Sequence, residues 1–168
     1  MSHKVCSPDC AIIFAEQEKE KNLLKKAKIE RKIDKERKVS LKSRSDWLKE
    51  AQTVFNQWIR LRDEKEPCIS CKRFHTGQYH AGHYLSTGAH PELRFEPLNV
   101  WKQCQPCNTH LSGNLINYRK SLIEKIGINK VEWLEGHHEF KKNTIDDFKI
   151  LIKEYRIKIS ELKKGRYD

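Results

Sequence analysis

The apolar residues of the first part of the chain are sparse and follow no sustained repeat. Residues 11–38 contain no Gly or Pro and are rich in Lys, Glu, Ala and Leu, which all favour helix. Their apolar positions do not continue as heptads, which disfavours a coiled coil. These positions are Ile12, Ile13, Phe14, Leu23, Leu24, Ile29 and Ile33. The pattern predicts a long, charged, solvent-exposed helix.

A second segment, residues 46–62, carries its apolar side chains at helical spacing. We expect an amphipathic helix, capped by Ser45 or Asp46, that packs on the core that follows. Its apolar residues are Trp47, Leu48, Ala51, Phe55, Trp58 and Ile59. Residues 67–107 are instead richer in Pro, Gly, Tyr, Phe and His, and their pattern is broken into short stretches. This predicts brief strands and loops.

Helical spacing returns after Asn108 and predicts two further helices. The first ends at Gly127, and the second covers about residues 145–162. In the second, basic residues alternate with apolar ones; they are Lys149, Lys153, Arg156 and Lys158. We therefore predict an α+β fold and divide the chain into a basic helical arm over 1–45, a core over 46–127 and a helical extension over 128–168.

Composition limits the size of that core and indicates a kind of partner. Of the 168 residues only 37% are hydrophobic, and the formal net charge is +11. Residues 11–45 carry twelve Lys or Arg against six Asp or Glu, whereas residues 66–113 carry four against three. A basic excess attracts polyanions, and DNA or RNA is the commonest polyanionic partner of a soluble protein.

The chain lacks the sequence features of membrane and secreted proteins. No stretch approaches the roughly 18 apolar residues that span a bilayer, and residues 1–9 lack the apolar run of a secretory signal. We therefore expect a soluble, cytoplasmic protein with no membrane partner. In that compartment cysteines are more often metal ligands or free thiols than disulfides.

Four of the six cysteines form two CxxC pairs, Cys68 with Cys71 and Cys104 with Cys107. A CxxC turn directs two thiolates at one ion, and structural zinc prefers four such ligands, so we predict one structural Zn²⁺. Free buried thiols and a redox CxxC are the alternatives. Cys6 and Cys10 form a third pair that cannot close a zinc site alone, and are either half of a truncated knuckle or ordinary thiols.

Histidines and asparagines lie between and just after these pairs: His75, His80, His83, His90, Asn99, Asn108 and His110. A single His there is more often a surface residue than a catalyst. The order His83, Asn99, His110 resembles the HNH nuclease pattern, in which a strand His, a loop Asn and a helix His surround one catalytic metal. This resemblance implies a small HNH-type ββα-metal core, held by the four-cysteine zinc site and flanked by long helices at both ends.

Hydrolysis of a phosphodiester needs a base for water and a cation for the developing charge. A neutral imidazole, with a pKa near ~6.5, suits the first task. The resemblance implies that His83 is this base, that Asn99 orients it or its loop, and that His110 binds a catalytic Mg²⁺ or Mn²⁺. Many HNH domains place an acidic ligand directly before the base, where this chain has Gly82, and we take His80 as the substitute ligand.

A longer stretch, HAGHYLSTGAHPELRFEPLNVWKQCQPCNTHLSGNLINYRKSLIEKIG, resembles the phage NinG family, as do FNQWIRLRD before CISC and the N-terminal KVCSPDCA. The resemblance covers nearly the whole chain and is most specific over 79–127. It implies a phage- or prophage-encoded endonuclease, acting in the bacterial cytoplasm on branched recombination intermediates such as Holliday junctions and D-loops. Spacing and composition by themselves support metal-dependent hydrolysis of nucleic acid. They do not indicate a preference for branched DNA.

Basic residues around the proposed site are candidates for phosphate contacts. Arg94 and Arg119 flank it and Lys102 lies near it, although each is equally a candidate for a solvated surface charge. Tyr84 and Phe95 fit a core better than base stacking. Symmetric cleavage of a four-way junction would favour a homodimer, to which the 11–38 helix is a candidate contributor. The competing functions are a non-enzymatic zinc-ribbon DNA-binding protein and an RNA-directed or toxin-like HNH enzyme.

Overall fold

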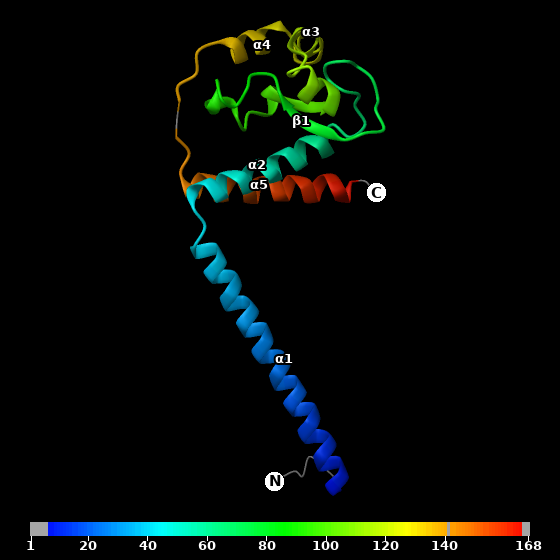
Figure 1. The fold of residues 1–168 in the computed structure, drawn as a ribbon, viewed down its shortest axis with the longest axis vertical. Helices are drawn as coiled ribbons and strands as arrows, with labels where there is room; N and C mark the ends of the chain where they lie inside the picture. Colours follow the sequence, from blue (N-terminus) through cyan, green and yellow to red (C-terminus); the bar gives the residue numbers. More distant parts are fainter. Residues whose placement is uncertain (1–6, 141, 166–168) are drawn as a thin grey trace. The chain divides into compact units, whose positions relative to one another are not determined.

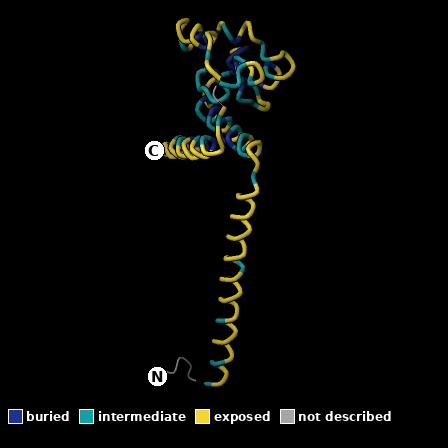
Figure 2. Tube along the Cα trace, turned by 90° about the vertical axis from the view of Figure 1, so that its left-hand side faces the viewer, coloured by how far each residue is buried: buried dark blue, intermediate teal, exposed yellow. Residues whose placement is uncertain are grey.

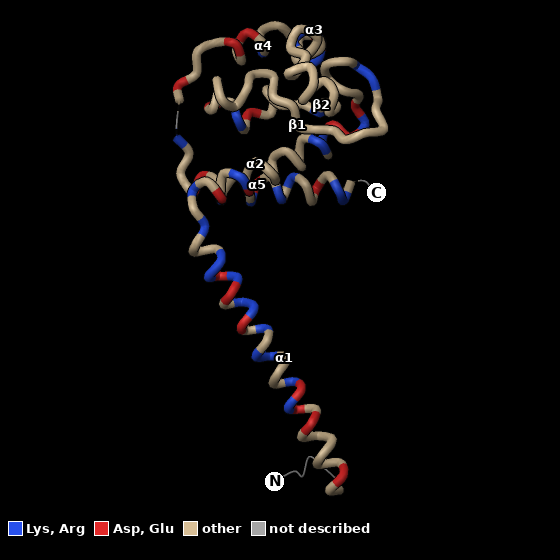
Figure 3. The backbone as a smooth tube through the Cα atoms, viewed as in Figure 1, with Lys and Arg blue, Asp and Glu red and all other residues tan. Residues whose placement is uncertain are grey.

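The protein is described by a computed structural model that covers residues 7–140 and 142–165 and divides the chain into two units, 1–43 and 44–168. The first unit is the helix α1 (Pro8–Ser40), none of whose residues is buried. Basic and acidic side chains are interspersed along it (Figure 3). Ser7 caps its start by accepting a hydrogen bond from the Cys10 amide at 3.2 Å. The predicted long exposed helix is therefore present; Cys6 lies outside the described residues.

The second unit is built on two helices that lie side by side, α2 (Arg44–Arg62) and α5 (Ile145–Lys164) (Figure 1). Their apolar faces form one core, whose fully buried members include Ala51, Phe55 and Ile59 from α2 and Phe148 from α5. The predicted cap at Ser45 or Asp46 is wrong, since α2 already begins at Arg44. A capping box between Thr144 and Asp147 starts α5.

A small antiparallel sheet rests on α2. Strand β1 (Tyr79–His83) pairs with β2 (Val100–Cys104), so that Tyr79 lies opposite Cys104 and His83 opposite Val100. Val100 is fully buried in the α2–α5 core, which fixes the sheet against the helices. Two 3₁₀ turns, Pro91–Leu93 and Pro97–Asn99, shape the connection between the strands.

A second apolar cluster lies outside the α2–α5 core. It joins α3 (Leu115–Ile126) and α4 (Ile128–Glu135) to the strand region; its buried residues are Ile69, Tyr84, Leu93, Tyr118, Leu122, Val131 and Leu134. Gly127 separates the two helices with a φ of +86°, a conformation that favours glycine. The sequence did not predict α4 as a separate element.

The fold is mostly helical, with a two-stranded sheet in the described residues. Burial is concentrated in residues 44–165, whereas α1 is mostly exposed and has no buried residue (Figure 2). Helix α5 completes the core that α2 begins, and both helices belong to the unit 44–168. No helix in the described part of the chain is long and apolar enough to cross a membrane.

Candidate functional site

The four predicted zinc ligands converge. Cys68, Cys71, Cys104 and Cys107 place their Sγ atoms within 4.8 Å of one another, and the pair Cys71–Cys104 is 3.9 Å apart. A tetrahedral zinc site with Zn–S bonds of about 2.3 Å requires S···S separations of about 3.8 Å. None of the five cysteines that the structure describes forms a disulfide. The geometry therefore fits a structural metal such as zinc.

Hydrogen-bond donors surround these sulfurs. The Cys104 amide lies 3.4 Å from Cys68 Sγ, and Asn114 Nδ2 lies 3.5 Å from Cys107 Sγ. Burial raises the pKa of Cys71, but hydrogen bonds, the largest from His75 at 3.2 Å, outweigh it and lower the pKa to about 6. Donors of this kind stabilise thiolates and orient metal ligands. The sequence did not single out Asn114 or assign a role to His75.

His83, at the end of β1, is held by the loop that follows it. Its Nε2 atom lies 3.0 Å from the carbonyl oxygen of Arg94. Since a carbonyl only accepts, Nε2 carries the proton, and Nδ1 of the neutral ring is left as a base. Burial lowers the pKa of His83, the hydrogen bond to the Arg94 carbonyl opposes this, and the positive charge of Arg94 lowers it further. The ring is therefore neutral at physiological pH.

Asn99 organises this loop from a fully buried position. Its Nδ2 donates to the carbonyls of Leu85 and Leu93 at 3.0 and 3.2 Å, and its Oδ1 accepts from the Leu85 amide at 2.8 Å. The Tyr84 amide in turn donates to the Asn99 carbonyl at 2.8 Å. One side chain thus ties both ends of the loop together next to His83.

His80 and His110 lie in a different set of contacts. A π-helical turn, Pro106–His110, contains Cys107 of the second CxxC pair, and its Asn108 donates from Nδ2 to His80 Nδ1 at 2.9 Å. His110 ends the turn and is exposed. Among the residues that the structure describes, only the four cysteines form a group of three or more Cys, His, Asp or Glu with converging ligand atoms. The hydrogen-bond partner of His80 is thus Asn108. Asn108 had no predicted role, although it directly follows Cys107.

The position before His83 is glycine for a steric reason. A Cβ on Gly82 would lie 2.1 Å from Gln103 Oε1 and 2.9 Å from Gln103 Cβ. Gln103 is fully buried, and its Nε2 donates to Ser70 Oγ and to the Gly113 carbonyl, both at 2.6 Å. The side chain of Gln103 therefore occupies the space that an acidic residue at position 82 would need.

This packing predicts a strong coupling between the two positions. We expect Gly82→Ala to lower the free energy of unfolding by about 1–3 kcal/mol, because the fixed Gln103 side chain cannot move aside. In the Gly82→Ala/Gln103→Ala double variant the clash is gone, so the total loss should be smaller than the sum of the two single losses. Urea unfolding of zinc-loaded protein measures this cycle, and strictly additive losses would show that the two side chains do not compete for space.

The three predicted phosphate contacts differ in availability. Arg94 is half-buried and donates to Gln52 Oε1 and to the Thr87 carbonyl, both at 3.3 Å. Arg119 forms a two-bond ion pair with Glu135, at 2.7 and 2.9 Å. Lys102 is 6% exposed and donates from Nζ to the Glu64 carbonyl at 2.8 Å. We therefore keep Arg94 as the strongest of the three candidates.

Tyr84 and Phe95 are packing residues. Tyr84 is buried in the cluster with α3 and α4, and its hydroxyl donates to Glu135. Phe95 packs on the α2–α5 core and meets Phe55 edge to face, with ring centroids 5.6 Å apart. Their assignment to the core is confirmed.

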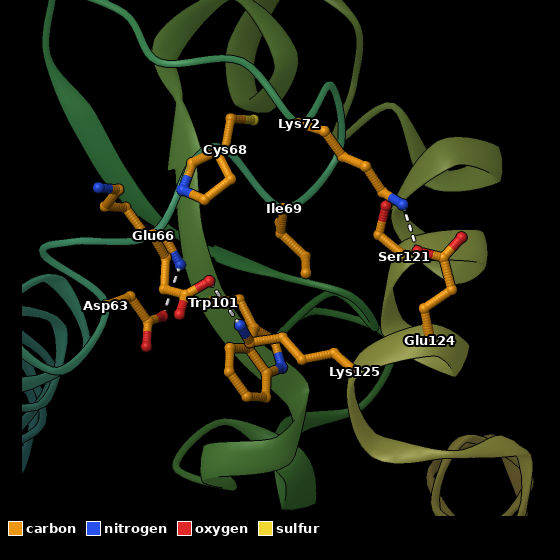
Figure 4. Close-up of a pocket in the computed structure, with 11 residues that line it drawn as sticks. Asp63, Glu66, Cys68, Ile69, Lys72, Trp101, Ser121, Glu124 and Lys125 are labelled. Atoms are coloured by element: carbon orange, nitrogen blue, oxygen red, sulfur yellow. Dashed lines mark hydrogen bonds and ion pairs between the residues drawn. The ribbon is translucent and has the colours of Figure 1, made fainter.

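A cavity of about 280 Å³ lies between residues 66–72 and α3 (Figure 4). In the lining of this cavity Lys125 forms an ion pair with Glu66 at 2.9 Å, and Lys72 forms one with Glu124. The charges of these four residues therefore largely cancel. None of the predicted catalytic residues lines it. It is therefore separate from the candidate active site.

The chain matches the family model described as Bacteriophage Lambda NinG protein over residues 1–165. It is 43% identical to Protein ninG of Salmonella phage P22 over 172 residues, which cover 96% of this chain and 85% of that protein. For Protein ninG of Escherichia phage lambda the identity is 42%, with 96% and 84% covered. For Protein ninG of Escherichia phage 933W it is 43% over 130 residues, with 77% and 65% covered. No solved structure matches the chain. The resemblance in the motifs around the two CxxC pairs is thus confirmed, and the chain belongs to the NinG family.

Proposed function

We propose that the chain is a metal-dependent DNA endonuclease of the HNH type, directed to branched recombination intermediates such as Holliday junctions and D-loops. The observation that carries this proposal is the state of His83. Its Nε2 proton is committed to the Arg94 carbonyl, and its depressed pKa keeps Nδ1 free to accept a proton. A general base for water requires this tautomer and this charge.

In the proposed reaction His83 takes a proton from the water that attacks the phosphodiester. Asn99 fixes the loop whose Arg94 carbonyl orients the imidazole, so its role is to position the base rather than to touch the substrate. We propose that the Arg94 side chain, on the same loop, contacts a phosphate oxygen beside the reacting one. These groups form the proposed catalytic half of the site.

We propose that the catalytic Mg²⁺ or Mn²⁺ binds at the second CxxC turn. The closeness of His80 and Asn108 supports this location, because an Asn108 amide turned so that its Oδ1 accepts from His80 Nδ1–H would leave Nε2 to bind the ion. His110 lies two residues further along the same turn. An ion held there supplies the positive charge that phosphodiester cleavage needs at the scissile phosphate and departing oxygen. The zinc of the four-cysteine cluster has the structural role of fixing this turn.

The alternative is a non-enzymatic zinc-ribbon protein that binds DNA through its basic helices. Such a protein would use the cysteines and the charge but would have no need of a desolvated, neutral His83 beside a buried Asn99. Those two features favour the nuclease. An RNA-directed HNH enzyme shares the active site and differs only in substrate, so RNA belongs in the same assay.

The test is cleavage of matched substrates by purified protein with Mg²⁺ or Mn²⁺. We expect four-way and three-stranded branched DNA to be nicked near the branch faster, by an order of magnitude or more, than linear duplex or RNA of the same sequence. Phosphate neutralisation alone attracts all of these and weakens as salt rises, so the comparison covers a salt series. Equal rates on branched and linear DNA at every salt concentration would refute the preference for branches, and no cleavage at all would favour the zinc-ribbon alternative.

Removal of residues 1–38 separates this preference from catalysis. The deleted part has no buried residue among those that the structure describes, and the proposed catalytic groups all lie in the unit 44–168. We expect the shortened chain to keep its rate on linear DNA and to lose part of its preference for branches.

A further inference from the structure

A basic groove beside the zinc cluster has no part in the proposed catalytic chemistry. We propose that this groove binds an unpaired stretch of DNA, with Ile116 at its border placed to insert between two bases. This inference rests on the proposed function for the source of such DNA, a branch point, and deepens it by naming the feature that the protein would recognise there.

The groove, of about 520 Å³, lies between residues 70–73 and α3. Asn114, the residue before α3, lines it together with one face of the helix, whose lining residues are Asn117, Lys120, Ser121 and Glu124. Lys72, Arg73 and Lys120 bring three positive charges against the single negative charge of Glu124. This net positive charge is complementary to a sugar-phosphate backbone, and the amide of Asn117 supplies a polar group suited to a base edge.

One exposed apolar side chain lies beside a residue of this groove. Ile116, in the first turn of α3, is 86% exposed. Ile116 precedes Lys120 by four residues, so the two side chains are neighbours on the helix surface. An apolar side chain that enters a base step loses its contact with water and unstacks the bases, and this requires less energy where pairing is already broken.

The turn that carries these residues is fixed to the zinc cluster. Ser112, Gly113 and Asn114 have φ values of +47°, +89° and +46°, a run of left-handed conformations that is strained for the two residues other than glycine. The Gly113 amide donates to the Cys107 carbonyl at 2.9 Å, and its carbonyl accepts from Gln103 and from Ser70. The turn from which Ile116 projects is therefore rigid, as insertion between bases requires.

The experiment measures binding without cleavage, with Ca²⁺ in place of Mg²⁺. The probe is a forked DNA with 2-aminopurine in one single strand next to the fork, whose fluorescence rises when that base is unstacked. We expect the parent protein to raise the fluorescence, and Ile116→Ser to abolish this rise and weaken binding roughly tenfold. The double variant Arg73→Ser/Lys120→Ser should reduce the slope of log affinity against log salt by about 1.4, as expected for two lost contacts to a single strand.

Matched variants away from the groove control for general effects. Ile150→Ser removes a 65% exposed isoleucine from α5, and Lys130→Ser removes an exposed lysine from α4. Both should bind and unstack the probe as the parent does. If Ile116→Ser behaves like Ile150→Ser, or the double variant leaves the salt slope unchanged, the groove is not a site for unpaired DNA. Because no cleavage is measured, this result is independent of whether His83 is a catalytic base.

Discussion

His83→Ala should abolish DNA cleavage and leave zinc content and DNA affinity close to those of the parent protein. A positioned general base typically accelerates a reaction by about 10²–10⁴-fold, and it acts on water rather than on bound DNA. The loss should therefore appear in the rate constant of single-turnover cleavage, with affinity measured separately in Ca²⁺. In the parent protein the rate should fall as pH drops through the pKa of His83, because the added proton occupies Nδ1. Since burial lowers that pKa, the fall should lie below pH 6.5.

Two other histidine changes serve as comparisons. His137 is exposed in the segment after α4, so His137→Ala should cut at the parental rate. His80→Ala should raise the concentration of Mg²⁺ or Mn²⁺ needed for half of the maximal rate, because it is proposed to hold the ion. A His83→Ala protein that cuts as fast as the parent would assign the base to another residue.

Cys104→Ser should release the zinc and unfold the region around the sheet. Structural zinc sites contribute roughly 10–16 kcal/mol of apparent binding energy, which is as large as the whole stability of a typical domain, about 5–15 kcal/mol. Cys104 is fully buried and ends β2, so its loss affects the cluster and the strand together. Elemental analysis should find one zinc in the cluster of the parent and none in that of the variant, with loss of cooperative thermal unfolding.

Cys10→Ser is the matched control, because Cys10 lies on α1 and outside the four-cysteine cluster. It should leave the metal of the cluster and the thermal transition unchanged. Folded, active parent protein that contains no zinc would overturn the assignment of the cluster as a structural zinc site.

Much of the helical framework could be predicted because it depends on local pattern. The predicted helices over 46–62 and 145–162 are close to α2 and α5, since apolar residues at helical spacing settle where a helix buries its face. Helix α4 was missed because it has only eight residues and follows α3 after one glycine. The convergence of the cysteines followed from the CxxC spacing, which restricts each pair to one ion.

The missed parts of the candidate site depend on contacts across the chain. The need for glycine at position 82 is set by Gln103, which reaches it only because β1 and β2 pair in this register. The contact between His80 and Asn108 spans 28 residues and comes from the π-helical turn, which the spacing of the second CxxC pair does not reveal. Likewise Lys102 is buried because β2 lies against the residues that follow α2, where its Nζ donates to the Glu64 carbonyl. A count of charges along the sequence could not show that Lys102 is unavailable to phosphate.

The pairing of α2 with α5 has a consequence for how the chain is made. An ion pair between Glu50 and Arg156 joins positions 106 residues apart, and most of the apolar face of α2 is covered by α5. During synthesis α2 leaves the ribosome long before its partner exists, and long-range contacts of this kind form slowly. All four cysteines of the cluster precede residue 145, so they are synthesised while half of the main core is still missing. A product truncated before residue 145 should therefore contain the whole cysteine cluster and expose Phe55 and Ile59 to aggregation.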